Sequence, residues 1–343
     1  MFINPAFNSG FAFVASILLL LAIAGCLSTE TKSVSQDVDT GIVHFNKLLL
    51  QNPENASYRH ERAKYFLGKN RLDSSLADLS IALKQDSAQP EYFVTLAEVY
   101  FKLNKIRFAI SALEKCLSLS PTHIEANLKL AELNLYVRNY QESMDEANTV
   151  LGSDPHHAKA YFIKGMIYRE TGDTTKAISS FRTVTEQDEE YYAAYMQLGI
   201  LLASKKDSLA LSYYSHALRI NPKSEEALYG MGKFFQDAHQ WNRALETYSL
   251  LLKNNFKFKY AHFNLGVIHL VNLKVPDEGI KHFSHAIQAD SNYTEAWYGR
   301  GSCFQTIGDV NKALADYKMA LKLSPEYSPA QEGFKEVMNL KKY

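Results

Sequence analysis

Four histidines near the carboxyl end of the chain are the residues whose types and spacing most suggest chemistry. They are His262, His269, His282 and His285. The first two are seven residues apart and the last two are three apart, so two neighbouring helices could bring their imidazoles together to bind zinc or nickel. The alternative is packing, because the first two occupy positions where a later, similar stretch has Trp297 and Phe304. We expect packing histidines, no metal site and no other cofactor.

Catalytic motifs are absent from the rest of the sequence. It contains no phosphate-binding loop, no glycine-rich dinucleotide turn, no HExxH motif and no Gly-x-Ser-x-Gly elbow. Cys116 and Cys303 fall on packing faces in different parts of the chain, which predicts buried free thiols. We therefore expect no enzymatic activity and no small-molecule substrate.

The amino terminus carries a different kind of chemical signal. Residues 11–25 form an uncharged run of 15 residues that ends directly at Cys26. As a helix this run would reach only about 22 Å, which is short of a bilayer core of about 30 Å, so a cleaved signal peptide fits better than a spanning helix. The alternative is an ordinary signal peptide or an anchor in which the cysteine is incidental.

The four residues Ile23-Ala24-Gly25-Cys26 resemble the lipobox of bacterial lipoproteins. The resemblance implies that residues 1–25 are removed, that the thiol of Cys26 is the lipid-attachment site, and that the mature chain is held at the bacterial cell envelope. We expect the outer membrane. Residues 1–25 depart from the usual pattern because they contain no Lys or Arg. Residues 26–40 are polar and without periodicity, which predicts a flexible tether.

The composition indicates that the rest of the chain is a folded protein. The 343 residues are 46% hydrophobic and carry 37 basic against 37 acidic side chains, which is too apolar and too neutral for disorder. A net charge of zero provides no electrostatic attraction to phosphate backbones, so we expect no nucleic acid partner. Three cysteines cannot cross-link a chain of this length, so stability must come from buried apolar area.

A period of about 34 residues organises the body of the chain. Small residues recur in steps of 33 to 35 residues at Ala63, Ala97, Ala131, Gly165, Gly199, Gly232, Gly266 and Gly301. Within one unit, apolar or small residues stand at i, i+4 and i+7 in two successive segments that a short Gly172-Asp173 turn separates. This pattern predicts two amphipathic helices per unit, with the small residues where the helices cross.

These columns resemble the tetratricopeptide repeat, and the stretch from Ala296-Trp297-Tyr298-Gly299-Arg300-Gly301 to Pro325 carries the resemblance most fully. It implies an all-α, right-handed superhelical solenoid of about eight helical hairpins. The repeats would occupy 54–325, between a capping half-repeat at 41–53 and a capping helix at 326–343. The third repeat has Asn127 and Asn134 at positions that are apolar in the other repeats. The seventh repeat is one residue longer than the usual 34, and we expect the extra residue near 274–277.

The first helices of stacked hairpins would line a concave face. We expect an apolar groove there, formed by Phe162, Met166, Met196, Ile200, Tyr229, Phe263, Val267 and Leu270. Such a surface suits an amphipathic helix or an extended hydrophobic peptide of a partner protein. The alternative is that neighbouring helices or the chain's own tail cover this stripe.

The sequence thus predicts a membrane-anchored envelope lipoprotein that serves as a scaffold for other proteins and assists assembly of envelope complexes. A second hypothesis is a recruiter that docks a cell-wall enzyme or a protease without catalysing a reaction. A third, metal-dependent module would use the four histidines. The partner, the membrane leaflet and the oligomeric state stay open at this point.

Overall fold

The computed structural model describes residues 39–340 of the chain. These residues form eighteen α-helices and one short π-helical segment, with no β-strand among them. Within this range no helix is long and apolar enough to cross a membrane. The predicted signal peptide, Cys26 and nearly all of the predicted tether lie outside the described residues.

Eight helical hairpins follow one another between two single helices, α1 Thr40–Gln51 and α18 Ser328–Leu340. The first helices of the hairpins are α2 Ala56–Gly68, α4 Pro90–Lys102, α6 Ile124–Tyr136, α8 Ala158–Glu170, α10 Tyr192–Ser204, α12 Glu225–Asp237, α14 Lys259–Val267 with its π-helical continuation η1 Ile268–Asn272, and α16 Thr294–Thr306. The second helices are α3 Leu72–Gln85, α5 Ile106–Leu119, α7 Tyr140–Ser153, α9 Thr174–Gln187, α11 Leu209–Ile220, α13 Trp241–Asn254, α15 Pro276–Ala289 and α17 Val310–Leu323.

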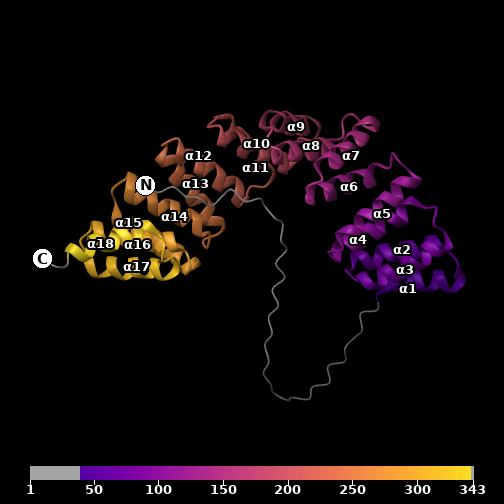
Figure 1. Cartoon of the computed structure of the whole chain (residues 1–343), viewed down its shortest axis with the longest axis horizontal. Coiled ribbons are helices and arrows are strands. Elements are labelled where there is room, and N and C mark those ends of the chain that lie inside the picture. The colour runs from indigo at the N-terminus through magenta and orange to yellow at the C-terminus, as the bar shows by residue number, and fades with distance from the viewer. Residues whose placement is uncertain (1–38, 341–343) are drawn as a thin grey trace, which may run out of the picture.

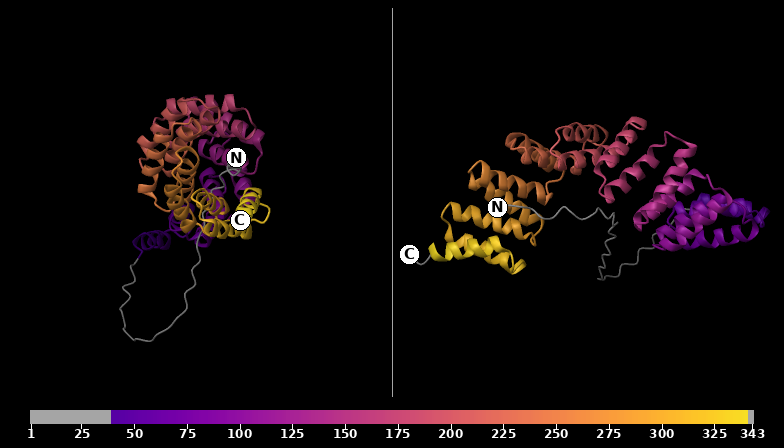
Figure 2. Two further views of the ribbon diagram at one scale, coloured as in Figure 1. Left: turned by 90° about the vertical axis from the view of Figure 1, so that its left-hand side faces the viewer. Right: turned by 45° about the horizontal axis from the view of Figure 1, so that its top comes forward.

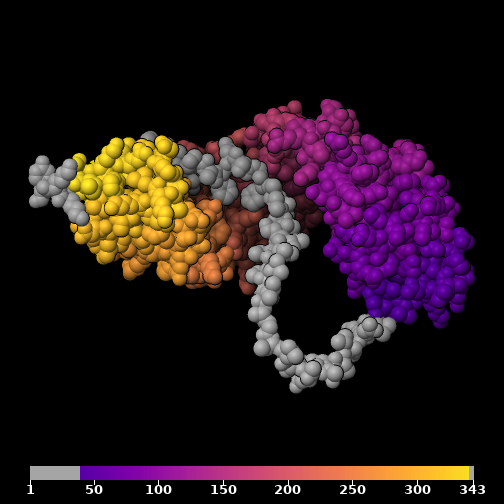
Figure 3. Space-filling model, turned by 60° about the horizontal axis from the view of Figure 1, so that its bottom comes forward, coloured from indigo at the N-terminus to yellow at the C-terminus, as the bar shows by residue number. Residues whose placement is uncertain are grey.

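The hairpins stack into a curved, all-helical solenoid, as the sequence predicted (Figure 1). Each second helix packs against the first helix of its own hairpin and of the next one. Seen along the long axis, the helices run around a ring (Figure 2). The space-filling view shows the two ends of the stack on opposite sides of an open hollow (Figure 3).

From the fourth hairpin onward, the periodic glycines let an aromatic ring lie directly against a helix backbone. A methyl group placed on Gly199 of α10 would lie 2.6 Å from the ring of Tyr214 in α11. One placed on Gly230 of the next hairpin would lie 2.7 Å from the same ring. Tyr214 is 2% exposed, so it is enclosed between two repeats and has no free space to enter. The small residues are thus required by close packing.

We expect Gly199→Ala to destabilise the protein by about 1–3 kcal/mol, because the new methyl group overlaps a ring that cannot move aside. The helix propensity of alanine offsets at most about 1 kcal/mol of this loss. Gly152→Ala in α7 is the matched control, because nothing lies within 4 Å of a methyl group there. It should leave the urea-unfolding midpoint unchanged or raise it. Equal midpoints for the two variants would contradict the packing role of Gly199.

The turn inside every hairpin contains one residue with a positive φ angle. These residues are Asn70, Asn104, Arg138, Gly172, Lys206, His239, Lys274 and Gly308. The left-handed conformation ends the first helix and redirects the chain into the second one. Only two of the eight are glycines, so the other turns accept the modest cost of this conformation for an L-residue.

The extra residue of the seventh repeat is not in the turn, where the sequence placed it. The turn between η1 and α15 has the ordinary length, and the extra residue is absorbed in the π-helical segment Ile268–Asn272. A π-helical turn accommodates one additional residue without breaking the helix. His269 lies in this segment, so the insertion changes the direction of a side chain that the sequence had singled out.

The asparagines of the third repeat are buried and satisfied. Asn127 is 3% exposed, and its Nδ2 donates to the carbonyl oxygens of Pro121 and His123 at 3.0 Å each. Asn134 is 5% exposed, and its Nδ2 donates to both carboxylate oxygens of Glu146 at 3.3 Å. Polar contacts therefore replace apolar ones in this repeat, as buried amides require.

Glu146 is a carboxylate without a cation. It occupies the position that Asp78 holds in the first repeat, where Arg62 Nε and Nη2 donate to the two carboxylate oxygens of Asp78 at 2.7 and 2.6 Å. In the third repeat the position of that arginine is occupied by Leu130. Burial therefore raises the pKa of Glu146 to about 7, and the hydrogen bonds from Asn134 oppose this shift only in part.

Candidate functional site

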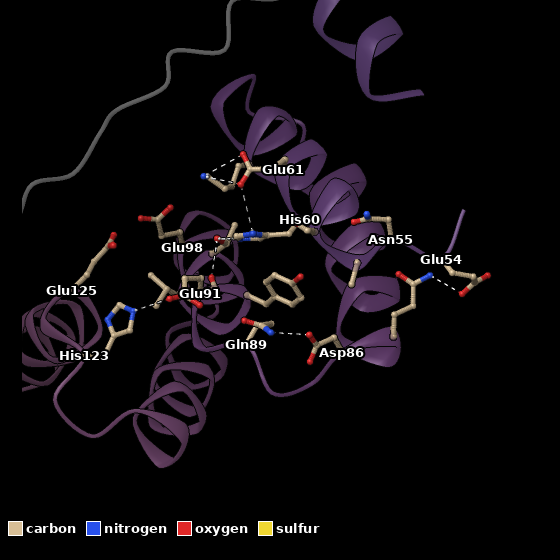
Figure 4. Close-up of a pocket in the computed structure, with 17 residues that line it drawn as sticks. Glu54, Asn55, His60, Glu61, Asp86, Gln89, Glu91, Glu98, His123 and Glu125 are labelled. Atoms are coloured by element: carbon tan, nitrogen blue, oxygen red, sulfur yellow. Dashed lines mark hydrogen bonds and ion pairs between the residues drawn. The ribbon is translucent and has the colours of Figure 1, made fainter. Parts of the chain in front are cut away.

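A pocket of about 760 Å³ opens on the amino-terminal repeats (Figure 4). Its wall comes from the first helices α2 and α4, from the start of α6, and from the loops that lead into them. The stacking of three successive hairpins thus assembles a surface from residues about one repeat apart. Its volume is in the range of ligand-binding pockets.

Carboxylates dominate the charged groups that line this pocket. The lining contains one lysine, Lys64, and six carboxylates. The carboxylates are Glu54, Glu61, Asp86, Glu91, Glu98 and Glu125. The pocket is therefore strongly acidic, although the chain as a whole has no net charge. Clefts lined by one sign of charge concentrate ligands of the opposite sign.

Some of these carboxylates are partly neutralised within the protein. Lys64 Nζ lies 3.2 Å from Glu61 Oε1, and Lys129 Nζ binds Glu98 and lies 3.4 Å from Glu125. Burial opposes the charge of Lys129, but these two carboxylates outweigh it and raise its pKa. Glu91 has only the imidazole of His123 nearby, at 3.9 Å, and its side chain is 61% exposed.

His60 stands at the centre of the pocket wall and is 7% exposed (Figure 4). Its Nε2 lies 2.8 Å from Thr95 Oγ1, and the Thr95 hydroxyl in turn lies 3.1 Å from the carbonyl oxygen of Glu91. A carbonyl can only accept, so both hydrogen bonds form only when His60 Nε2 carries the proton and donates to Thr95. Burial lowers the pKa of His60, which keeps the ring neutral.

The other ring nitrogen of His60 is consequently an acceptor. Nδ1 lies 3.9 Å from a carboxylate oxygen of Glu61, which is also an acceptor. The ring of Tyr92, 4.6 Å away, packs against the imidazole and fixes its orientation. The pocket thus presents the lone pair of His60 Nδ1 beside the Glu61 carboxylate, which accepts from Lys64 Nζ at 3.2 Å.

The eight residues of the sequence-predicted apolar groove differ in their exposure to solvent. Of these eight residues, Met196, Phe263 and Leu270 are buried in the hydrophobic core, at 5%, 7% and 9% exposure. The other first-helix residues Phe162, Met166, Tyr229 and Val267 are half-buried. Only Ile200 is exposed, at 44%. Neighbouring rings reduce the exposure of this stripe: Tyr191, in the loop before α10, packs against Phe162 with the ring centroids 5.1 Å apart.

The four carboxyl-terminal histidines do come together across the seventh hairpin. His262 is 1% exposed, its Nε2 lies 2.9 Å from the Phe256 carbonyl oxygen, and its Nδ1 lies 3.4 Å from His282 Nδ1. The ring of His269 stacks on that of His282 at 5.4 Å, and the ring of His285 lies 5.0 Å from that of His262. Burial lowers the pKa of His262 and His269 and lowers that of His282 to about 4.

This arrangement is a packed imidazole cluster. Within residues 39–340, no three His, Cys, Asp or Glu side chains are placed to hold one metal ion. His262 Nε2 donates to the carbonyl oxygen of Phe256, so its Nδ1 accepts from His282 Nδ1–H. His262 and His282 are thus hydrogen-bonded to each other, whereas Nδ1 of His269 is buried without a hydrogen-bond partner.

The two described cysteines are buried free thiols, as the sequence predicted. Burial raises the pKa of Cys116 to about 11 and that of Cys303 to about 12. Both thiols therefore stay protonated near neutral pH, and neither is a nucleophile.

The sequence reasoning missed the acidic pocket. The predicted groove begins at Phe162 in the fourth repeat, three repeats beyond His60. Extending the same 34-residue register to the first repeat would have placed His60 and Lys64 on that face. No sequence signal shows that Glu91 and Glu125, at the starts of their helices, join them.

Comparison with known proteins agrees with this architecture. Three segments match models of the tetratricopeptide repeat, at residues 90–123, 158–191 and 294–327. Superkiller protein 3 of Schizosaccharomyces pombe is 25% identical over 82% of this chain and 19% of that protein. The DnaJ homolog subfamily C member 7 homolog of Dictyostelium discoideum is 20% identical over 88% of this chain and 62% of that protein. The chain thus spans less than two thirds of the length of these relatives.

Solved structures show the same fold. The C-terminal part of a TPR repeat-containing protein from Cytophaga hutchinsonii superposes with a TM-score of 0.61 at 16% identity, over 71% of this chain and 99% of that one. A tetratricopeptide repeat protein from Parabacteroides merdae gives a TM-score of 0.51 at 14% identity, over 73% of this chain and 98% of that one. The fold is therefore a solenoid of helical hairpins like that of these repeat proteins, and three of its segments match the tetratricopeptide repeat. This fold is typically a non-catalytic scaffold that binds other proteins or peptides.

Proposed function

We propose that this chain is an envelope scaffold that is anchored through a lipid on Cys26 and binds a segment of a partner protein in its amino-terminal pocket. The observation that carries the proposal is the pocket itself. It is assembled from the first helices of consecutive hairpins and is open to solvent, whereas the apolar stripe further along the stack is largely covered.

The chemistry of the pocket favours recognition over catalysis. His60 is held neutral and tied to Thr95, and the carboxylates around it are spread along three helices. The Thr95 hydroxyl donates to the carbonyl oxygen of Glu91 and accepts from His60 Nε2, so the imidazole is not placed to act as a base on this hydroxyl, as covalent catalysis would require. Spread charges along a concave surface are what an extended segment of a partner protein can contact at several points.

The anchor is supported by the sequence alone. The apolar run at 11–25 and the lipobox-like residues ending in Cys26 imply a diacylglycerol on that thiol. Acyl chains contribute about 0.8 kcal/mol for each buried CH₂ group, so more than one chain on the cysteine gives stable membrane attachment. The scaffold would then hold its partner close to the membrane surface. Assembly of envelope complexes and recruitment of a cell-wall enzyme both fit this role, and the identity of the partner separates them.

Site-specific photocrosslinking in the native envelope tests the proposal. A photoreactive amino acid replaces Ser57 in the pocket, Ile200 on the apolar stripe, or Ser249 on a second helix, all three of which are exposed. We expect a defined product from position 57, mapped by mass spectrometry to one segment of one protein, and none from position 249. A product from position 200 alone would indicate that the partner binds at the apolar groove, and it would refute the pocket as the binding site.

Fractionation of the same cells tests whether a lipid on Cys26 anchors the protein to the membrane. Full-length protein should fractionate with membranes, and Cys26→Ser should appear in the soluble fraction or remain unprocessed. Normal processing and membrane recovery of Cys26→Ser would refute lipid attachment at this residue.

A further inference from the structure

The amino-terminal pocket has an excess of hydrogen-bond acceptors. Its carboxylates outnumber its one lysine, and the charges of Glu61, Glu98 and Glu125 are only shared with Lys64 and Lys129. Glu91 has no cation apart from the distant imidazole of His123. Like charges gathered on one surface repel one another, so a cation that entered the pocket would relieve this repulsion.

The orientation of His60 points to the same kind of ligand by an independent argument. The side chain is about nine-tenths buried, with 9% exposure, and its Nε2 proton is committed to Thr95. Its Nδ1 therefore presents a lone pair, and no hydrogen bond to this atom is formed within the described residues. His60 lines the open pocket, and its Nδ1 is not closed off from solvent, so a donor that enters the pocket can reach this lone pair.

We propose that the pocket binds a lysine-bearing segment of the partner protein, with the lysine ammonium seated between His60 Nδ1 and the Glu61 carboxylate. The proposal rests on the proposed function and adds the chemical class of the ligand. The two acceptors are 3.9 Å apart, so one nitrogen can donate a hydrogen bond of about 2.9 Å to each. Glu91 and Glu98 extend the acidic surface along α4 for further basic residues of the same segment.

A basic segment suits this site better than a metal ion. No three ligands converge within residues 39–340 as a metal requires, whereas the acidic groups are distributed over three helices. An ammonium group has three donors on a flexible stem and can reach between two acceptors in a recessed wall. The same charge pattern repels acidic segments and the carboxyl terminus of a partner chain.

Binding of defined peptides to the full chain in a non-ionic detergent tests the proposal. The probe is a short fluorescent Gly-Ser peptide that carries several lysines and an acetylated amino terminus. Its counterparts replace every lysine with acetyl-lysine or with glutamate. We expect saturable binding of the lysine peptide that weakens as salt rises, and binding of the two counterparts at least about tenfold weaker.

Protein variants locate the binding. Glu61→Gln combined with Glu91→Gln should weaken the lysine peptide about tenfold or more. His60→Gln should weaken it several-fold, because the glutamine amide can still donate to Thr95 but offers no acceptor at the place of Nδ1. The matched control is Glu186→Gln combined with Glu246→Gln, two exposed carboxylates on second helices, which should bind as the unmodified protein does. Melting curves confirm that each variant is folded, and Glu91→Gln alone serves as the milder variant.

Two results would overturn the inference. One is equal affinity for the lysine and acetyl-lysine peptides, and the other is equal weakening by the pocket variant and the control variant. The crosslink from position 57 distinguishes failure of the lysine-binding proposal from failure of the proposed function. A mapped partner segment without lysine refutes the basic ligand alone, whereas the absence of any product at position 57 refutes the pocket as a binding site.

Discussion

Replacing Arg300 by methionine should lower the free energy of unfolding by about 3–5 kcal/mol, because it leaves a buried carboxylate without its cation. Arg300 Nε and Nη2 donate to the two carboxylate oxygens of Asp316 at 2.7 and 2.9 Å, and Asp316 is 5% exposed. A third donor, Nη1, lies 3.1 Å from Ser284 Oγ of the preceding hairpin. The guanidinium thus joins α16, α17 and α15, so its loss affects the interface between two repeats.

Urea unfolding together with hydrogen exchange in α16 and α17 measures this effect. The double variant Arg300→Met with Asp316→Leu should recover much of the loss, since no buried charge remains. Lys312→Met is the control, because its pair with Asp309 spans one turn of α17 and the lysine side chain is 64% exposed. It should change stability by less than about 1 kcal/mol. An Arg300→Met variant no less stable than Lys312→Met would contradict the role of the buried pair.

Acidification from pH 7 to pH 4 should destabilise the seventh repeat through its histidine cluster. Burial, together with repulsion from the neighbouring His262 and His269, lowers the pKa of His282 to about 4. In the unfolded chain the imidazole titrates near 6.5. Between these values the unfolded state binds the extra proton, so stability is complete above about pH 6.5 and falls as the pH drops toward 4. The expected loss from His282 is about 2 kcal/mol after allowing for its partial exposure.

The groups that face His282 set the size of this effect. His262, His269 and His285 oppose its protonation, and Glu278 of α15 favours it. His282→Asn places a neutral amide near the position of Nδ1 and should flatten the dependence of stability on pH between 4 and 6.5. The control is His156→Asn, because His156 is exposed in the loop before α8. The prediction fails if both variants retain the full acid sensitivity of the unmodified chain, measured by hydrogen exchange in α14 and α15.

The arrangement of the fold was predictable because its governing contacts are local and recur. Each hairpin forms between residues within about one repeat, so a period of about 34 in small residues and the following rings carries the information. The contact of Gly199 with Tyr214 is one instance, since the glycine column exists to admit the ring. The buried state of Cys116 and Cys303 follows from the same register.

The surfaces were not predictable to the same degree, because exposure depends on how neighbouring hairpins are inclined. The register places Met196 and Phe263 on the inward side of their helices, but the angle between repeats decides that adjacent rings cover them. The extra residue of the seventh repeat could be absorbed in a turn or in a helix, and packing selected the π-helical segment Ile268–Asn272.

By itself, the sequence determined the repeat, the helical hairpins and the residues at their crossings, since these are properties of helix periodicity and side-chain size. The tertiary structure alone decided the site. His60 meets Thr95 across 35 residues, and Lys129 meets Glu98 across 31, so the acidic pocket exists only where successive first helices are brought side by side. It also decided the tautomer of His60, because that follows from a hydrogen bond between two repeats and from no feature of either one alone.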